Sequence, residues 1–430
     1  MSMDAQTAWA EAMKFGNRPD PYPYFEELRK TPVAKVSEKT YVVTGYPELL
    51  ALAHDPRISS DISRSPSGLL GEKPDPEPGT QNMASYGKDS SIIVSDPPDH
   101  DRMRRQVMRH FGPPHSPDLI PGMEPFITEL ANSLLDTIAA EGKSRFDVVD
   151  DFAYPIPVAV ICKILGIPVQ DEPTFHAWIF DFMKGTNLGP ERDTEEGRAL
   201  AAKAVASTVA LDGYLRDLVE KYAKEPGEGL LSGLLHDDGP DGPMSVEETT
   251  ANASLLLVAG HDSTVNTITN CVMTLLRNPG SWELVRGRPE LIPRMIEEVQ
   301  RLQSAVQFFP SRSATADIDI GGTVIPAGAA VHLIYAAANR DPRRFPNPDR
   351  FDPLREDNEH FGWGSGIHTC MGGPLARLEV NLALEAFLSR VSSPKLVVDP
   401  PVYRHNQVFR GPQHLWVDFA SIAPEQKATL

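Results

Sequence analysis

Apolar residues recur at the helical period through the middle of the chain, in residues 115–310. This period places apolar side chains on one face of a helix. Residues 123–142 and 374–391 show it as amphipathic segments, and residues 21–30 have the composition of a helix start. The pattern therefore predicts a mainly helical protein.

The longest predicted helix follows Ser245. Ser245 and Glu248 form the S-x-x-E pattern of a capping box, in which each side chain accepts a hydrogen bond from the backbone N–H of the other residue. The largely apolar stretch that follows contains no proline before Pro279. Gly260 and Asp262 interrupt its apolar pattern near the middle. Such interruptions are expected at functional sites.

Several shorter segments have strand-like patterns. Residues 32–46 alternate and contain Val, Thr and Tyr, which predicts a hairpin. Residues 315–335 predict short strands around a turn, and residues 408–419 predict a terminal strand pair. We therefore expect one mainly α domain spanning residues 1–430, with small peripheral β-sheets. The segments expected to be irregular or flexible are 1–15, 64–90, 184–197, 338–357 and 423–430.

The composition is that of a globular protein. Hydrophobic residues make up 41% of the 430 residues, which is enough for a sizeable core. No apolar run is long enough to span a bilayer, and the N-terminus lacks the features of a secretory signal. We therefore expect a soluble, cytoplasmic protein without a membrane partner. The formal net charge of −18 disfavours nonspecific nucleic-acid binding.

The three cysteines have different surroundings. Cys162 and Cys271 lie among apolar residues and are predicted to be small core side chains. Cys370 lies among glycines and a histidine, just before the predicted helix at 374–391. Glycines allow the backbone to approach a flat ligand, and a helix N-terminus stabilises a thiolate. Cys370 is therefore a candidate metal ligand, and the alternative is a buried structural cysteine in a glycine turn.

The segment around Cys370 resembles the haem-binding signature of the cytochromes P-450, F-x-x-G-x-x-x-C-x-G. Gly366, Cys370 and Gly372 match this signature. Trp363 stands where the family has phenylalanine, so we expect the larger indole to pack against the ligand and to tune its hydrogen bonding and the iron potential. The resemblance implies that the protein binds haem b and that Cys370 ligates its iron. A thiolate ligand favours cleavage of the O–O bond of bound dioxygen.

Residues 259–264, A-G-H-D-S-T, resemble the acid–alcohol pair of the family. The resemblance implies that Gly260 makes room for dioxygen and that Asp262 supplies the acid. Ser263 stands where the family usually has threonine, and Thr264 follows it. A hydroxyl with a connected acid can deliver protons, although serine has a freer rotamer than threonine. The alternative is a helix with a solvated aspartate and hydroxyls that hydrogen-bond its own backbone.

Glu298 and Arg301 match the E-x-x-R motif of the family and share one helix face. In the family this pair contacts an irregular segment that carries an arginine. The resemblance therefore implies a folding role, with Arg350 as the expected partner.

Four basic residues are implied as ligands of the haem carboxylates, because charge-assisted hydrogen bonds suit a buried dianionic group. They are His100, Arg104, Arg312 and His368. Arg105 and Arg109 are expected to form an exposed basic face, which could dock an acidic ferredoxin or flavodoxin.

The motifs follow the family's order between residues 97 and 379. The resemblance implies the cytochrome P-450 fold and a monooxygenase that inserts one atom of O2 into a hydrophobic small molecule. Electrons are expected from NAD(P)H through a separate ferredoxin or flavodoxin and its reductase, since no flavin or iron–sulfur domain follows residue 430. Residues 409–412, F-R-G-P, resemble the tail of members that demethylate aromatic ethers, so hydroxylation and oxidative dealkylation are both expected reactions. By family position, the substrate is expected to be surrounded by 64–90, 175–205, Phe308, Phe309, Val408 and Phe409.

Other functions stay open. The same fold could serve a peroxide-using peroxygenase, an isomerase or a dehydratase. It could also serve a non-catalytic haem sensor or ligand carrier. Members that lack monooxygenase activity commonly lose the acid–alcohol pair, and a carrier has no need of it. Asp262 and Ser263 therefore favour a monooxygenase.

Overall fold

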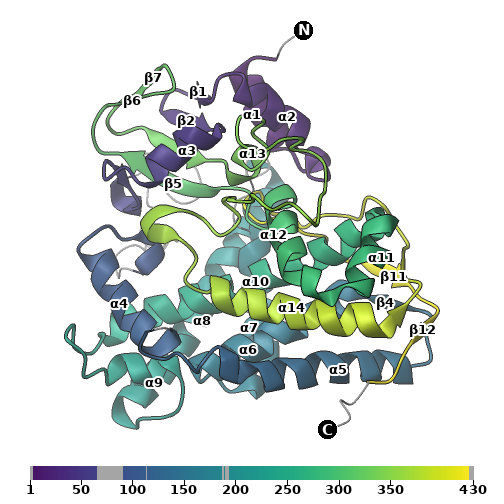
Figure 1. The fold of residues 1–430 in the computed structure, drawn as a ribbon. Coiled ribbons are helices and arrows are strands. Elements are labelled where there is room, and N and C mark those ends of the chain that lie inside the picture. The colour runs from purple at the N-terminus through teal and green to yellow at the C-terminus, as the bar shows by residue number, and fades with distance from the viewer. Residues whose placement is uncertain (1–2, 65–90, 113, 186–187, 189–192, 426–430) are drawn as a thin grey trace.

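The structure is a computed structural model that describes residues 3–64, 91–112, 114–185, 188 and 193–425. Helices dominate it (Figure 1). The α-helices are α1 (Ala5–Ala12), α2 (Tyr22–Arg29), α3 (Tyr46–Ala53), α4 (Asp99–Phe111), α5 (Glu124–Ala140), α6 (Pro155–Leu165), α7 (Glu172–Gly185), α8 (Glu195–Lys224), α9 (Leu230–Leu235), α10 (Val246–Arg277), α11 (Pro279–Gly287), α12 (Ile292–Leu302), α13 (Tyr335–Ala338) and α14 (Gly373–Arg390). The strands are β1 (Val33–Lys35), β2 (Thr40–Val43), β3 (Ile58–Ser59), β4 (Arg145–Asp147), β5 (Phe309–Ala314), β6 (Ile318–Ile320), β7 (Thr323–Ile325), β8 (Ala330–Leu333), β9 (Val391–Ser392), β10 (Lys395–Leu396), β11 (Trp416–Asp418) and β12 (Ser421–Ile422).

A five-stranded sheet of order β1-β2-β8-β5-β3 lies at one side of the molecule, in the upper part of Figure 1. β2 and β8 are parallel, and the other neighbours are antiparallel. Buried apolar side chains join this sheet to α1, α2 and α3. The sheet carries one predicted site residue, because Arg312 lies on β5.

Helix α10 runs through the helical part of the molecule, where it contacts α6, α8, α12 and α14. The predicted capping box is present at its start: the Ser245 side chain accepts from the Glu248 N–H, and the Glu248 side chain accepts from the Ser245 N–H. The helix ends at Arg277, just before Pro279. Most of its side chains are buried, as expected for a helix at the centre of a core. No helix in the described part of the chain is both long and apolar enough to cross a membrane.

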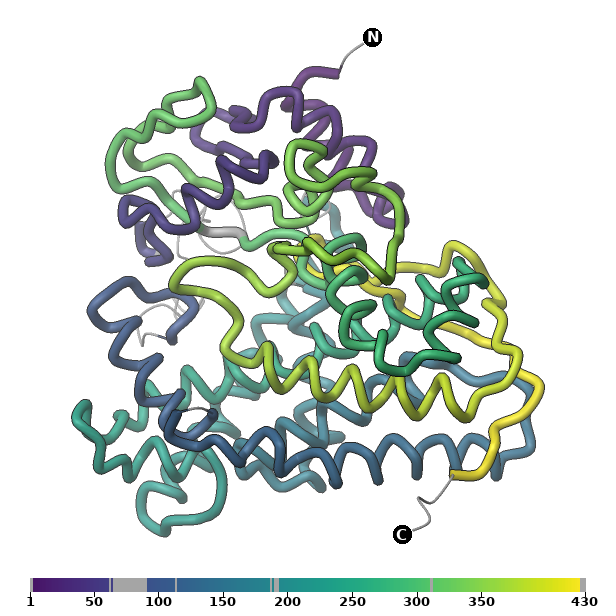
Figure 2. Tube along the Cα trace, viewed as in Figure 1, coloured from purple at the N-terminus to yellow at the C-terminus, as the bar shows by residue number. Residues whose placement is uncertain are grey.

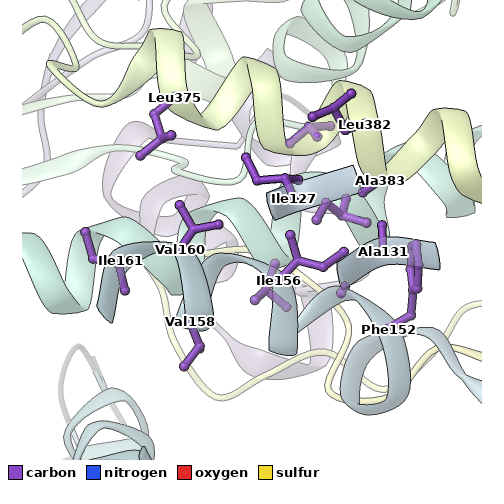
Figure 3. Packing of buried hydrophobic residues seen from close by; sticks show 14 of the residues in the cluster. Ile127, Ala131, Phe152, Ile156, Val158, Val160, Ile161, Leu375, Leu382 and Ala383 are labelled. Carbon is purple, nitrogen blue, oxygen red and sulfur yellow. The ribbon is translucent and has the colours of Figure 1, made fainter. Parts of the chain in front are cut away.

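Helix α14 packs across α5 and α6 through apolar side chains (Figure 3). Leu375 and Ala383 belong to α14, Ile127 to α5 and Val160 to α6, and all are part of one buried cluster. These contacts fix α14 in the helical core. They therefore also fix Cys370, which lies just before the first turn of that helix.

Most of the predicted elements are confirmed. Residues 21–30, 123–142 and 374–391 contain α2, α5 and α14. Residues 32–46 contain β1 and β2, which pair antiparallel as a hairpin. Residues 315–335 contain the strands β6, β7 and β8. The helical period and the alternating pattern were therefore reliable where they extended over many residues.

The flexible start predicted for residues 1–15 is wrong. This segment contains α1, and its Ala8 and Ala12 are fully buried. In the tail predicted for 423–430, Glu425 accepts a hydrogen bond from Asn132, and the flexibility of the tail stays a prediction. Residues 65–90 and 426–430 lie outside the described residues.

The strand pair predicted for residues 408–419 is wrong as well. Phe409 forms an isolated bridge with Val306. The one strand in this segment, β11, pairs with β4 and β10. The segment therefore pairs with distant parts of the chain and does not form a hairpin of its own.

The Glu298–Arg301 pair is completely buried on α12, and Arg301 Nε donates to Glu298 Oε2 at 2.8 Å. Arg301 also donates to the carbonyl of Asn339, in the proline-rich segment that follows α13. The second arginine bound to Glu298 is Arg355, whose Nε lies 3.0 Å from Glu298 Oε2. The predicted partner Arg350 is wrong, because Arg350 offers only its backbone carbonyl, 3.3 Å from Arg301 Nη2.

Candidate active site

Cys370 ends a glycine-rich loop directly before α14. Gly364 and Gly366 have φ angles of +74° and +68°, which side chains other than glycine rarely adopt. A Cβ at Gly366 would also overlap the carbonyl oxygen of Ala53. The Cys370 N–H donates to the Trp363 carbonyl at 2.8 Å, which closes the loop. The Cys370 side chain remains exposed to solvent.

Opposing influences act on the Cys370 sulfur. Desolvation by the surrounding protein atoms raises the pKa of the thiol, even though solvent still reaches it. Hydrogen bonds from the Gly372 and Gly373 amides and the positive charges of Arg377 and Arg104 oppose this rise in pKa. A metal cation would decide the balance, because a coordinating thiol is deprotonated outright. The sulfur is thus an accessible ligand on a rigid element.

A short strip of α10 is open to solvent. Ala259 is exposed and Ser263 is half-buried, although both lie in the middle of a largely buried helix. Gly260 does not face this strip, because a Cβ there would lie 2.9 Å from the Ile161 Cδ1 of α6. Gly260 therefore allows the close packing of α10 on α6, and its role of making room for dioxygen stays a prediction.

Asp262 is buried and has two partners. Its carboxylate is ion-paired with Arg404, and it accepts from Asn266 Nδ2 at 3.1 Å. The alternative of a solvated aspartate is therefore wrong. Arg404 was missed in the sequence, because it lies 142 residues beyond Asp262 and belongs to no motif. The two residues meet because the chain after residue 400 packs back onto α10, as the bond from Asn270 Nδ2 to the Arg410 carbonyl also shows.

The two hydroxyls after Asp262 hydrogen-bond the helix backbone. Ser263 Oγ donates to the Ala259 carbonyl at 2.9 Å, and Thr264 Oγ1 donates to the Gly260 carbonyl at 3.3 Å. Ser263 lies beside the open strip, whereas Thr264 is buried. Ser263 is therefore the better placed of the two to meet a ligand there.

The four predicted carboxylate ligands come from three elements and lie together. His100 of α4 is stacked edge-on against His368 of the cysteine loop, with ring centroids 4.7 Å apart. Arg104, one turn further along α4, donates from Nη2 to the Thr369 carbonyl at 2.8 Å. Arg312 of β5 completes the group, because its charge acts on His368.

This basic cluster needs an anion. Burial and the nearby charges of Arg312, His100 and Arg104 lower the pKa of His368 to about 2. Arg312 Nη1 and His100 Nε2 are buried and have no hydrogen-bond partner among the described residues. Leaving such groups unpaired is costly. A ligand with two carboxylates would satisfy them, so the residues present fit the carboxylates of haem.

Trp363 is held by residues that the sequence did not single out. Its indole Nε1 donates to Glu297 Oε2 at 2.9 Å. Burial opposes ionisation of Glu297, but hydrogen bonds from His360 and Arg377 lower its pKa to about 2. Glu297 directly precedes the E-x-x-R motif, and this position is the one signal that pointed to it.

The two arginines expected to form an exposed basic face are both paired with acids. Arg105 pairs with Asp241, with Nη2 and Oδ1 2.7 Å apart. Arg109 pairs with Asp237, with Nε and Oδ1 3.1 Å apart. The Arg105 side chain is still 59% exposed, and the docking of a ferredoxin or flavodoxin at this face stays a prediction.

Two of the residues expected around a substrate are part of the core. Phe308 and Val408 are buried, and the Phe308 ring lies 5.7 Å from that of Trp9. They pack α1 and α2 onto the sheet. Phe309 and Phe409 are only half-buried and remain candidates for a substrate-lining role.

Comparisons with known proteins agree with this arrangement. The family model described as Cytochrome P450 matches residues 288–415. The 6-deoxyerythronolide B hydroxylase of Saccharopolyspora erythraea is 35% identical over 403 residues, which cover 92% of this chain and 95% of the relative. The vitamin D(3) 25-hydroxylase of Pseudonocardia autotrophica is 36% identical over 399 residues, which cover 91% of this chain and 92% of the relative. The crystal structure of ligand-free CYP164A2 of Mycobacterium smegmatis has a TM-score of 0.83 and 33% identity, covering 96% of this chain and 100% of that chain.

A helical fold of this kind, shared with enzymes that hydroxylate organic molecules, defines the class of protein. The chain belongs to the cytochrome P450 family. It is a P450 monooxygenase, and the family implies the use of haem iron and dioxygen.

Proposed function

We propose that this chain binds haem b through Cys370 and uses it to insert one atom of O2 into a hydrophobic small molecule. The observation that carries the proposal is a pair of buried nitrogens, Arg312 Nη1 and His100 Nε2, that have no hydrogen-bond partner among the described residues. They belong to a basic cluster that includes His368 of the cysteine loop. A ligand that needs both a thiolate and a dicarboxylate anchor suits this arrangement.

The proposed haem contacts are divided between two ends of the site. Cys370 Sγ would ligate the iron, with the Gly372 and Gly373 amides as its hydrogen-bond donors. The propionates would be held by the basic cluster. Its members are His100, Arg104, Arg312 and His368. Bound haem would supply an iron that binds and activates dioxygen, and a thiolate ligand favours O–O cleavage.

The open strip of α10 supports a proton relay. Ser263 Oγ now donates to the Ala259 carbonyl, and rotation about χ1 would turn its proton toward the open side of the helix. Asp262 is the adjacent acid, and its carboxylate is held by Arg404 and Asn266. Arg404 is partly exposed, so it links the buried acid to solvent. Ser263 would thus hold the proton that is transferred, and Asp262 would help to supply a new proton to Ser263 afterwards.

The substrate is proposed only as a hydrophobic small molecule. The two hydroxylases above act, by their names, on different substrates at 35% and 36% identity, so identity does not choose between them. Dealkylation of an aromatic ether is a narrower proposal that rests on residues 409–412. Arg410 is buried and donates to the Pro19 carbonyl, and a Cβ at Gly411 would overlap Asn266. Packing therefore accounts for these residues, and hydroxylation is the broader and preferred proposal.

We propose that electrons reach the haem from NAD(P)H through a separate ferredoxin or flavodoxin and its reductase. Turnover with surrogate redox proteins and a panel of hydrophobic compounds tests this. Product that appears only with both redox proteins supports the proposal. Equal turnover with peroxide alone would favour the peroxygenase alternative.

The experiment that tests haem ligation is the difference spectrum of reduced protein with and without carbon monoxide. We expect the red-shifted Soret band of a thiolate-ligated haem in the wild type and its loss in Cys370→Ala. A histidine-type band in the wild type would contradict the proposal.

A further inference from the structure

The tryptophan in the cysteine loop belongs to a network centred on Glu297 of α12. Glu297 Oε2 accepts from Trp363 Nε1 at 2.9 Å and lies 3.1 Å from His360 Nε2. Glu297 Oε1 accepts from Arg377 Nε of α14 at 2.7 Å. The Arg377 guanidinium carbon lies 4.4 Å from the Trp363 ring centroid, a cation–π contact. The indole is therefore fixed both at its edge and over its face.

This network reaches Cys370 directly. The Cys370 N–H donates to the Trp363 carbonyl at 2.8 Å. A Cβ at Gly373 would lie 3.8 Å from Trp363 Cε3, 4.0 Å from Cys370 Cβ and 3.1 Å from Arg377 Nη1. The indole, the cysteine and the guanidinium thus meet around the first residue of α14. A movement of the indole would therefore change the surroundings of the Cys370 sulfur.

The hydrogen bond to Glu297 uses the only donor that the Trp363 ring has. It is a strong bond, because the acceptor is a carboxylate whose pKa is lowered by hydrogen bonds from His360 and Arg377. The N–H is therefore not available to the Cys370 sulfur.

We propose that Glu297 is a positioning residue that holds the Trp363 N–H away from Cys370 and so preserves the electron donation of the sulfur to the haem iron. A hydrogen bond from the indole would stabilise negative charge on the sulfur and weaken this donation. With the indole held in this way, the donors to the sulfur among the described residues are the backbone amides of Gly372 and Gly373. The proposal rests on Cys370 as the haem ligand, which the carbon monoxide spectrum of the wild type tests separately.

The test compares haem-loaded wild type, Glu297→Leu, Trp363→Phe and the double variant. Two quantities are measured: the ferric–ferrous midpoint potential, and the Fe–S stretching frequency by resonance Raman spectroscopy. We expect Glu297→Leu to shift the potential to more positive values and to lower the Fe–S frequency, because the freed N–H can turn to the sulfur. The same substitution in the Trp363→Phe background should have a much smaller effect, since no N–H is present. Glu297→Gln keeps an acceptor without the charge, and we expect it to restore most of the wild-type frequency.

Equal shifts in the two backgrounds would show that Glu297 acts only through its charge, and would overturn the proposal. If the Glu297→Leu variant does not bind haem, the comparison of Trp363→Phe with the wild type tests the proposal by itself. We expect its Fe–S frequency to stay close to that of the wild type, because the N–H does not reach the sulfur. A marked rise in frequency would show that the indole already bonds the sulfur, which contradicts the proposal.

Discussion

The Ser263 hydroxyl lies beside the open strip of α10, so its removal tests the proton relay at the scale of one atom. A positioned proton donor contributes roughly 10²–10⁴-fold to a reaction. We expect Ser263→Ala to lower product formed per NAD(P)H consumed by at least about tenfold, with haem content unchanged. Ser263→Thr keeps the hydroxyl in a stiffer rotamer and should retain coupling. Full coupling in Ser263→Ala would remove Ser263 from the relay.

We expect substitution of Arg312 to have different effects on the stability of the haem-free protein and on haem binding. The Arg312 guanidinium is buried, and Nη1 has no hydrogen-bond partner in the described part of the chain. An unpaired buried charge destabilises a fold. We expect Arg312→Gln to leave the stability of the haem-free protein unchanged or higher. Haem should transfer to a scavenger roughly ten- to a hundredfold faster, which corresponds to a lost charge-assisted bond of about 1.5–3 kcal/mol.

The matched control for this variant is Arg350→Gln, because the Arg350 side chain is exposed. We expect its haem transfer rate to equal that of the wild type. Equal rates in all three proteins would show that Arg312 does not hold a propionate.

Functional residues that belong to a short sequence motif could be predicted. Residues whose role depends on a contact between distant parts of the chain could not. Cys370 and Asp262 stand in short motifs, so the sequence alone singled them out. The pairing of Asp262 with Arg404 depends on a contact across 142 residues, which no local pattern encodes. The wrong choice of Arg350 over Arg355 has the same origin, because both lie in one proline-rich segment and only its folded path selects the partner of Glu298.

At the scale of elements, the cysteine loop depends on the backbone of Gly366. A left-handed conformation costs a non-glycine residue roughly 1–2 kcal/mol, and a Cβ would also overlap Ala53. We expect Gly366→Ala to shift Cys370 and to reduce the fraction of protein with the thiolate-type carbon monoxide band. Gly213→Ala is the control, since Gly213 lies within α8 and a Cβ there would have no described atom within 4 Å. An intact band in Gly366→Ala would show that the loop tolerates the change.

Long elements were predictable because their signals add up over many residues. The capping box and the apolar run of α10 are read from consecutive residues, and the structure has both. Helix α1 has 8 residues, too few for a clear period. In the segment 408–419, Val408 and Phe409 pack with the N-terminal region, and the Arg410 carbonyl accepts a hydrogen bond from Asn270 of α10. Alternation alone could not distinguish this arrangement from a strand pair.

At the scale of the whole molecule, the Glu298 carboxylate joins α12 to the irregular segment that leads to the cysteine loop. It accepts from Arg301 and Arg355 and also from the Asp352 N–H at 3.0 Å. Removal of one partner from a buried ion pair costs roughly 3–5 kcal/mol, because the other charge stays buried. Most domains have only about 5–15 kcal/mol of stability in total.

We therefore expect Glu298→Gln to lower the urea midpoint strongly or to abolish the yield of soluble, haem-loaded protein. Glu290→Gln is the matched control, because Glu290 pairs with Arg288 at the surface and both side chains are largely exposed. Its midpoint should equal that of the wild type, since exposed pairs contribute little. If both variants unfolded alike, the loss would not be specific to the buried pair. If Glu298→Gln were as stable as the wild type, the segment before the cysteine loop would be held by its backbone contacts alone, and the folding role of the pair would be refuted.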